Sequence, residues 1–242
     1  KSLRVAVDNV LQARAHVIRQ DRPRGDLVRP VFIIGAPRSG TSFLHNALAK
    51  IEGIRVPEIW EARYQAPPRH HNPADYVRRI RAAREAATKA IPLKVASMLV
   101  SGRSPLCAAS DSEIMMPTFW SANWGTMFRW QAYFDKWQAQ DMRPALRYHR
   151  RVMEEWAYYR PGDRFVFRDN WHQFHMDDLR DVYPEATIIH VKRDLGVCLE
   201  KFAATMRIIN PNFGNMDEIA KIWSDVCHDS ISADITISCD EL

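Results

Sequence analysis

The sequence predicts a three-layer α/β/α domain, in which helices cover both faces of a central parallel sheet and helical insertions interrupt the order of strands. Two observations predict this class. The apolar run Val31–Ile34 is typical of a strand buried on both faces of a parallel sheet, and a glycine-containing turn leads from it directly into a helical pattern. The second half of the chain repeats the alternation of short apolar strand and helix.

The spacing of apolar residues predicts the order of elements. We expect a helix at 3–19, a strand at 31–34, a helix at 41–50, a short strand at 54–59, helices at 73–90, after 113 and at 144–159, a strand at 165–167, a helix at 173–182, a strand at 186–191, and helices at 195–206 and 216–227. The insertions thus lie between the second and third strands. The tryptophan-rich residues 118–140 are expected to cover the sheet or to form a lid.

Local start and stop signals justify several of these boundaries. Asn72 and Pro73 are typical of the first positions of a helix, here the one predicted at 73–90. The pair Pro161-Gly162 ends the helix predicted at 144–159. Ser110 and Glu113 have the spacing of a capping box. A turn is expected at 212–214, ahead of the last helix.

Composition limits the class of protein. Hydrophobic residues make up 46% and charged residues 26% of the 242 positions, which excludes a disordered or fibrous chain. No apolar run reaches the roughly 18 to 20 residues of a membrane-spanning helix, so we expect no integral membrane segment. We interpret residues 1–242 as a single domain, and truncation at either end stays open because the chain begins with Lys1.

The net charge and the cysteine spacing limit which binding partners and which cellular compartment are expected. The net charge of +5 suits an anionic small molecule as well as nucleic acid or an anionic membrane surface. The four cysteines, at 107, 198, 227 and 239, form no C-x-x-C pair and match no zinc spacing, so we expect free thiols and no metal site. Because no signal peptide is visible, we expect a cytoplasmic protein.

Residues 35–42, Gly-Ala-Pro-Arg-Ser-Gly-Thr-Ser, carry the strongest chemical signal. They follow a buried strand and open a helix, which is the setting of a phosphate-binding loop, because backbone N–H groups and the helix dipole attract an anion there. Both glycines of a Walker A loop are present, but Thr41 stands at the position of its lysine, and Arg38 supplies the positive charge. The fold is therefore expected to be P-loop-like.

At this loop the sequence resembles the sulfotransferase superfamily, in particular its bacterial type. Residues 37–42 are similar to its 5′-phosphosulfate loop, P-[KR]-[ST]-G-T-[ST], and residues 165–194 resemble a strand ending in L-K-S-P-x-H, a helix, a Tyr/Phe-Pro turn and a strand ending in H-x-R-D-P. Trp60-Glu61 and Ser112-Glu113 resemble the same branch more loosely. The resemblance covers roughly residues 25 to 206.

The resemblance implies a reaction. It implies transfer of a sulfuryl group from 3′-phosphoadenosine 5′-phosphosulfate (PAPS), without a metal, to a hydroxyl of a small-molecule, lipid or sugar acceptor. The residues expected to hold the donor are Pro37, Arg38, Ser39, Gly40, Thr41 and Ser42 at its 5′ end and Arg193 at its 3′-phosphate. Arg38 is also expected to act on the leaving phosphate.

The chain departs from the family pattern at several of these positions. Residues 168–170 are Arg-Asp-Asn where the family has Lys-Ser-Pro, and Leu195 replaces a proline. Lys201 stands where the family places a serine on the 3′-phosphate, and a lysine can reach a phosphate as a charge. Arg168 is expected to replace the usual lysine near the transferred group.

The residue that accepts the proton of the acceptor hydroxyl is left open between two candidates. His172 lies just beyond the third strand, near the place of a catalytic histidine in cytosolic sulfotransferases, and histidine suits proton transfer at neutral pH. Glu61 follows the second strand, where some bacterial sulfotransferases hold a carboxylate base. His45, on the first helix after the loop, is expected to be structural.

Two other functions stay open at the level of sequence. A P-loop nucleotide phosphotransferase is disfavoured by the missing Walker lysine, and a non-catalytic nucleotide-binding descendant is kept open by the changes at Asp169, Leu195 and Lys201. The arginines at 78, 81 and 84 share one helix, but no aromatic residues alternate with them, so we expect no nucleic-acid partner. The aromatic residues at 119–137 favour an apolar acceptor pocket, and the oligomeric state is not predicted.

Overall fold

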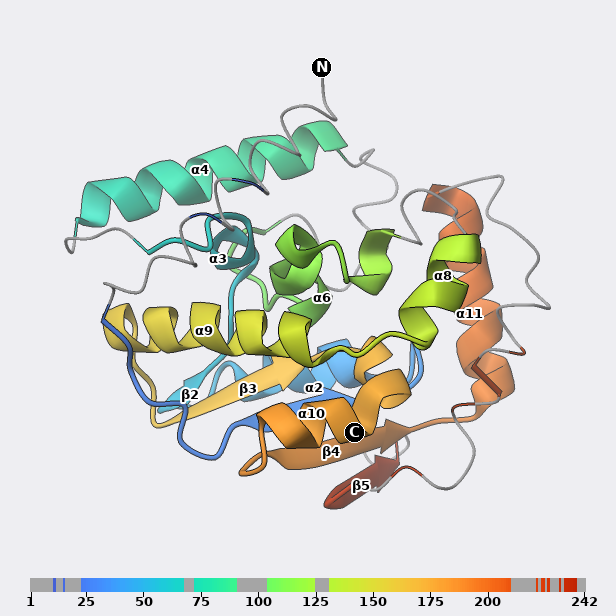
Figure 1. Cartoon of the computed structure of the whole chain (residues 1–242). Coiled ribbons are helices and arrows are strands. Elements are labelled where there is room, and N and C mark those ends of the chain that lie inside the picture. Colours follow the sequence, from blue (N-terminus) through green and yellow to red (C-terminus); the bar gives the residue numbers. More distant parts are fainter. Residues whose placement is uncertain are drawn as a thin grey trace.

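The computed structural model of the chain describes residues 23–67, 72–90, 104–124, 131–209 and 233–238, with seven further single positions (11, 15, 221, 223, 224, 226 and 231). Figure 1 shows a sheet with helices on either side. The elements are β1 (Val31–Ile34), α2 (Thr41–Leu48), β2 (Ile54–Arg55), α3 (Ile59–Arg63), α4 (Pro73–Ala90), α6 (Asp111–Met115), η1 (Met116–Thr118), α8 (Gln131–Gln138), α9 (Arg143–Tyr159), β3 (Arg164–Arg168), η2 (Trp171–His175), α10 (Met176–Val182), β4 (Thr187–Lys192), α11 (Leu195–Ile209) and β5 (Ile235–Ser238).

The sheet has five strands in the order β2-β3-β1-β4-β5, and every neighbouring pair is parallel. This confirms the predicted three-layer α/β/α architecture. β1 is the central strand, with β3 on one side and β4 on the other, so the three segments that follow these strands emerge together at one edge. The helical insertions α3 to α9 lie between β2 and β3, as predicted.

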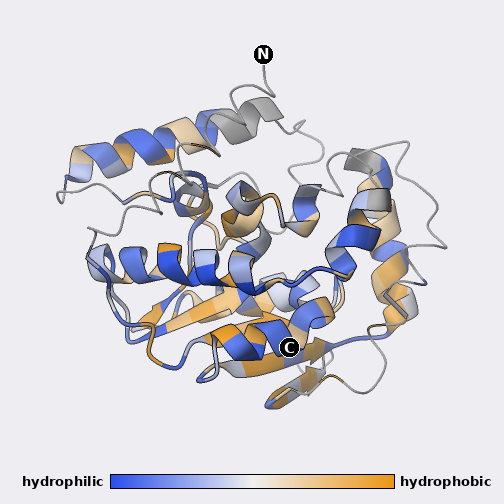
Figure 2. Cartoon of the chain, viewed as in Figure 1, coloured by the Kyte–Doolittle hydropathy of each residue, from blue (hydrophilic) through white to orange (hydrophobic). Residues whose placement is uncertain are grey.

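Alternate residues of β1 point to opposite faces of the sheet and enter different cores. Phe32 and Ile34 pack with the buried face of α9 and α10, whereas Val31 and Ile33 pack with Leu44 on α2. All four residues of β1 are buried, which is why the run is uniformly apolar instead of alternating. The orange strands in Figure 2 show this composition, and Figure 1 shows α9 and α10 together in front of the sheet.

Two local predictions need correction. The second strand is only two residues long, because Pro57 lacks an N–H donor and Glu58 already caps α3. The capping box predicted at Ser110 and Glu113 is wrong: α6 does begin after Ser110, but that hydroxyl donates a hydrogen bond to Asp169 and makes no cap bond. A true capping box joins Glu58 and Glu61.

β5 is a strand that the sequence analysis did not predict. It pairs in parallel with β4, Ile235 opposite Ile189, and closes one edge of the sheet. Most of the predicted helix at 3–19, the turn at 212–214 and most of the helix at 216–227 lie outside the described residues. In the described part of the chain, no helix combines the length and apolar character needed to cross a membrane.

Candidate active site

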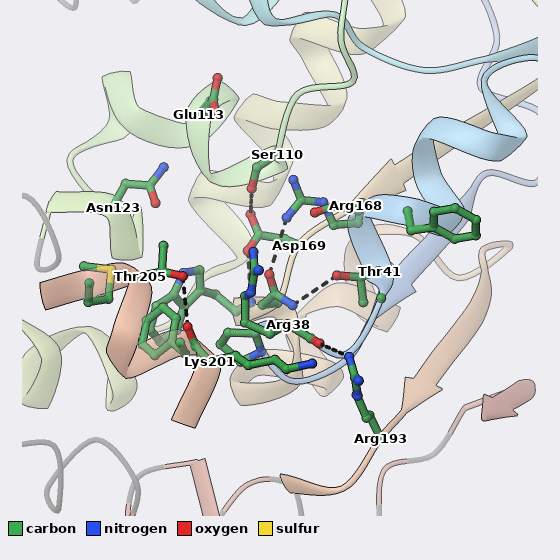
Figure 3. A pocket seen from close by; sticks show the side chains of 18 residues that line it. Arg38, Thr41, Ser110, Glu113, Asn123, Arg168, Asp169, Arg193, Lys201 and Thr205 are labelled. Carbon is green, nitrogen blue, oxygen red and sulfur yellow. Dashed lines mark hydrogen bonds between the residues drawn. The ribbon is translucent and has the colours of Figure 1, made fainter. Parts of the chain in front are cut away.

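A cavity of about 500 Å³ opens at the edge where β1, β3 and β4 end. Parallel α/β sheets bind ligands at this edge, where the strand order reverses. Four segments line the cavity: the loop and first turn at 37–43, the segment 168–171 after β3, Arg193 after β4, and residues 201–206 of α11. Ser110, Glu113 and Asn123 from the insertion complete the lining, as Figure 3 shows.

The phosphate loop takes its shape from three residues with positive φ. Gly35 has φ 153°, and a Cβ there would lie 2.5 Å from the carbonyl oxygen of Val191, so only glycine lets β1 and β4 approach this closely. Arg38 has φ 71°, an unusual value for a residue with a side chain. Gly40, with φ 111°, begins α2 without any side-chain cap, so the first N–H groups of this helix stay available to an anion.

The hydroxyl groups of the loop differ in their surroundings. Ser39 is fully buried, and its hydroxyl has no hydrogen-bond partner among the described residues. Thr41 is buried and lines the cavity together with Ser42. Ser39 is not among the residues that line the cavity, so Thr41 and Ser42 supply the loop hydroxyls that a ligand there could reach.

Asn170 connects the end of β3 to the loop. Its Nδ2 donates to the carbonyl oxygens of Gly35 (2.6 Å) and Ala36 (3.2 Å) and lies 3.3 Å from Oγ1 of Thr41. Its Oδ1 is 3.4 Å from a guanidinium nitrogen of Arg168. Figure 3 draws the two contacts that end on Thr41 and Arg168 as dashed lines. A proline at this position would supply none of them, so the departure from the family pattern adds a polar clamp on the loop.

Asp169 connects the same strand end to the insertion. Its Oδ2 accepts hydrogen bonds from the Ser110 hydroxyl (2.7 Å) and the Ser112 N–H (2.5 Å), and its Oδ1 accepts the Trp171 N–H at 2.9 Å. With three donors on a buried carboxylate, Asp169 fixes the start of α6 against β3. The sequence analysis noted Asp169 and Asn170 only as departures, although polar residues directly after a buried strand are typical of a site at this edge.

Cationic side chains dominate the lining of the cavity. Arg38, Arg168, Arg193 and Lys201 carry positive charge, against the two carboxylates Glu113 and Asp169. Arg193 is half-buried and donates to the carbonyl oxygen of Arg38 at 3.3 Å, which links β4 to the loop. Lys201 is exposed on α11. The structure thus brings together nearly all of the residues expected to hold the donor, on one cavity that favours an anion.

His172 lies outside the lining of this cavity. It is buried beneath α6, with its Nε2 2.8 Å from Oδ2 of Asp111, and the edge of its ring meets Phe32. Burial lowers the pKa of His172, but the hydrogen bond and the charge of Asp111 outweigh it, and the pKa is raised overall. His149 lies 3.4 Å from the other oxygen of Asp111. The three groups form a buried network that holds α6 against the core.

Glu61 also lies away from the cavity. Its carboxylate pairs with Arg55 and Arg160 and accepts the Glu58 N–H at 2.8 Å, and the residue is only 1% exposed. These contacts join β2, α3 and the end of α9. His45 is structural, as expected: its ring is 3.0 Å from the Val166 carbonyl oxygen, and burial lowers its pKa to about 4.

Glu113 is the site residue that the sequence analysis misinterpreted. It lines the cavity from α6, and burial raises the pKa of its carboxyl group even though Arg63 and Arg168 act to lower it. The apolar residues that follow Glu113 favoured its interpretation as a cap, because the sequence alone does not show which way a short helix faces. In the described residues, no group of three or more His, Cys, Asp or Glu side chains is arranged to hold a metal ion.

Comparisons with known proteins agree with this site. The model of the sulfotransferase family matches residues 30–236. Among solved structures, sulfotransferase STF9 from Mycobacterium avium superposes with a TM-score of 0.74 at 19% identity, over 97% of this chain and 64% of that one. Sulfotransferase STF1 from Mycobacterium tuberculosis H37Rv gives 0.68 at 19% identity, over 86% and 58%. The chain therefore spans less than two thirds of either structure, and these likenesses show the fold. No curated protein matches the chain by sequence.

Proposed function

The chain belongs to the sulfotransferase family, and we propose that it transfers a sulfuryl group from PAPS to a hydroxyl of a small-molecule, lipid or sugar acceptor. One observation carries the proposal. The phosphate loop, the polar residues after β3 and Arg193 after β4 come from three separate parts of the chain and line one cavity.

The residues present fit a donor with phosphates at two ends. The uncapped start of α2 and the hydroxyls of Thr41 and Ser42, which line the cavity, suit the 5′ end of the donor. Arg193 and Lys201, on β4's end and α11, suit the 3′-phosphate. PAPS supplies an activated sulfuryl group and leaves as 3′-phosphoadenosine 5′-phosphate (PAP).

In this proposal, the protein holds positive charges and N–H donors in position around the donor before the transfer begins. Arg38, Thr41 and the N–H groups at the start of α2 neutralise the negative charge that builds on the leaving phosphate. Arg168 lies between the loop and α6 and is placed to stabilise the transferred group. Because four cations line the cavity, this mechanism needs no metal ion.

Nucleotide binding to an Arg193→Ala variant tests the proposal. A charge-assisted hydrogen bond contributes about 1.5–3 kcal/mol, so PAP should bind about 10- to 100-fold more weakly, whereas AMP, which lacks the 3′-phosphate, should bind almost as before. Isothermal titration calorimetry measures both affinities. Arg207→Ala, an exposed arginine on the same helix as Lys201, is the control and should change neither.

The same titrations contain the results that would contradict the proposal. Equal losses for PAP and AMP would mean that Arg193 supports the fold instead of a 3′-phosphate. ATP that binds the wild type more tightly than PAP, with a requirement for magnesium, would favour a phosphotransferase.

A further inference from the structure

Two carboxylates line the cavity, and their surroundings differ. Both oxygens of Asp169 are engaged by three donors, from Ser110, Ser112 and Trp171. The carboxylate of Glu113 makes no hydrogen bond or ion pair within the part of the chain that the structure describes, and only its backbone N–H is bonded, to the Ser110 carbonyl oxygen. A carboxylate that already accepts three hydrogen bonds is a weak base, whereas one without donors keeps its lone pairs for a proton.

Glu113 also lies at the opposite side of the site from the residues assigned to the donor. In Figure 3, Glu113 and Asn123 are on one side of Asp169 and Arg168, and Arg38 and Arg193 are on the other. A donor held by the loop and by Arg193 leaves the part of the cavity next to Glu113 for the acceptor.

We propose that Glu113 is the general base that accepts the proton of the acceptor hydroxyl. This inference rests on the proposed function and assigns the role that neither His172 nor Glu61 fills, because both lie outside the cavity lining. No histidine is among the residues that line the cavity in the described part of the chain.

The proton and the electron pairs balance in this step. The acceptor O–H bond breaks and its proton passes to a carboxylate oxygen of Glu113, while the acceptor oxygen forms a bond to sulfur. The bond between sulfur and the bridging oxygen of the donor breaks, and PAP leaves with that electron pair. Glu113 then releases its proton to solvent, which restores the carboxylate.

The surroundings of Glu113 suit a base. Burial raises the pKa of its carboxyl group and the nearby charge of Asp169 adds to this, while Arg63 on α3 and Arg168 at the end of β3 act in the opposite direction. The helix that carries Glu113 is fixed from two sides, by Asp169 at its start and by the contact of Asp111 with His172 below it. The backbone that carries the Glu113 carboxylate is thus fixed, while no side-chain hydrogen bond from the described residues occupies the carboxylate oxygens.

Release of PAP from PAPS in the presence of a panel of simple alcohols, phenols and sugars tests the assignment without knowledge of the natural acceptor, because every transfer to a hydroxyl releases one PAP. Glu113→Gln keeps the shape of the side chain and removes the base, so PAP release should fall by about 100-fold or more. The affinity for PAP should stay within about twofold, which also shows that the variant is folded. Glu113→Asp should recover part of the rate. Glu200→Gln, an exposed carboxylate on α11, is the matched control.

The pH dependence separates a base from a structural residue. In the wild type, release of PAP should rise with pH through the raised pKa of Glu113, because only the carboxylate accepts a proton. This rise should be absent in Glu113→Gln. An undiminished rate in Glu113→Gln, or a loss of PAP affinity equal to the loss of rate, would overturn the assignment of Glu113 as the base but would leave the proposed function standing. A wild type that binds no PAP or releases none from PAPS would overturn the proposed function and this step together.

Discussion

Asn170 offers a direct test of the phosphate loop, because its side chain holds the loop without belonging to it. Asn170→Ala removes an amide that donates to the carbonyl oxygens of Gly35 and Ala36 and lies within reach of Thr41. The loop contains three residues with positive φ, Gly35, Arg38 and Gly40, so it depends on its neighbours to stay in this conformation. The variant should therefore bind phosphate less well while keeping its fold.

The size of the effect follows from the bonds lost. The amide has two N–H groups, and a neutral hydrogen bond contributes about 0.5–1.5 kcal/mol, so removing both costs about 1–3 kcal/mol. If that energy keeps the loop ordered for its anion, the affinity for PAP falls by about 5- to 150-fold. Asn170→Asp should be weaker still, because it turns a carboxylate toward two carbonyl oxygens and an anionic ligand.

Calorimetric titration with PAP, together with chemical denaturation, measures both consequences. Asn72→Ala is the control: Asn72 caps α4 at a distance from the site, so its loss should lower stability by about 1 kcal/mol and leave PAP affinity unchanged. Wild-type affinity for PAP in Asn170→Ala would refute the view that the amide organises the loop.

Three further predictions concern groups around the site. Glu61→Ala should lower the free energy of unfolding by about 3 kcal/mol, because Arg55 loses its buried partner. The rate of PAP release from PAPS should stay within twofold of the wild type. A variant that loses this rate at full stability would instead make Glu61 catalytic. His45 has a folded pKa of about 4 against 6.5 when unfolded, so the unfolded chain binds its proton first and stability should fall by about 3 kcal/mol as pH drops from 6.5 to 4. Denaturation of His45→Gln at several pH values should show a shallower fall. PAP affinity should be the same with EDTA, and a loss restored by magnesium would contradict the metal-free mechanism.

The sequence predicted the elements whose signals are local. The buried strand Val31–Ile34 and the glycine loop after it need no knowledge of the rest of the chain, because an apolar run and two glycines specify them. The helix from Pro73 and the helix ending at Tyr159 were placed within a residue or two for the same reason. β5 was missed because its four residues, Ile235–Ser238, become a strand only through pairing with β4.

The side of the cavity proposed to hold the donor was predictable, and the side proposed to hold the acceptor was not. Arg38 and Arg193 each follow an apolar strand, so their place at the carboxyl edge could be inferred from position alone. Glu113 belongs to an insertion whose direction is set by tertiary bonds to Asp169, which no local pattern encodes. His172 was the better candidate on chemical type, but although the preceding residue Trp171 lines the cavity, the His172 side chain is buried against Asp111.

The strand order has a consequence for the way this protein folds. Asn170 and Gly35 are 135 positions apart, and Arg193 and Arg38 are 155 apart, yet both pairs meet at the loop. Contacts of such sequence separation form only after long stretches of chain have been closed, so refolding should be slow for a domain of this size. Because the loop is clamped only when β3 and β4 have joined β1, recovery of PAP binding should be among the last events in refolding. A ligand that binds only the fully folded protein therefore shifts the equilibrium from partly folded states toward the native fold.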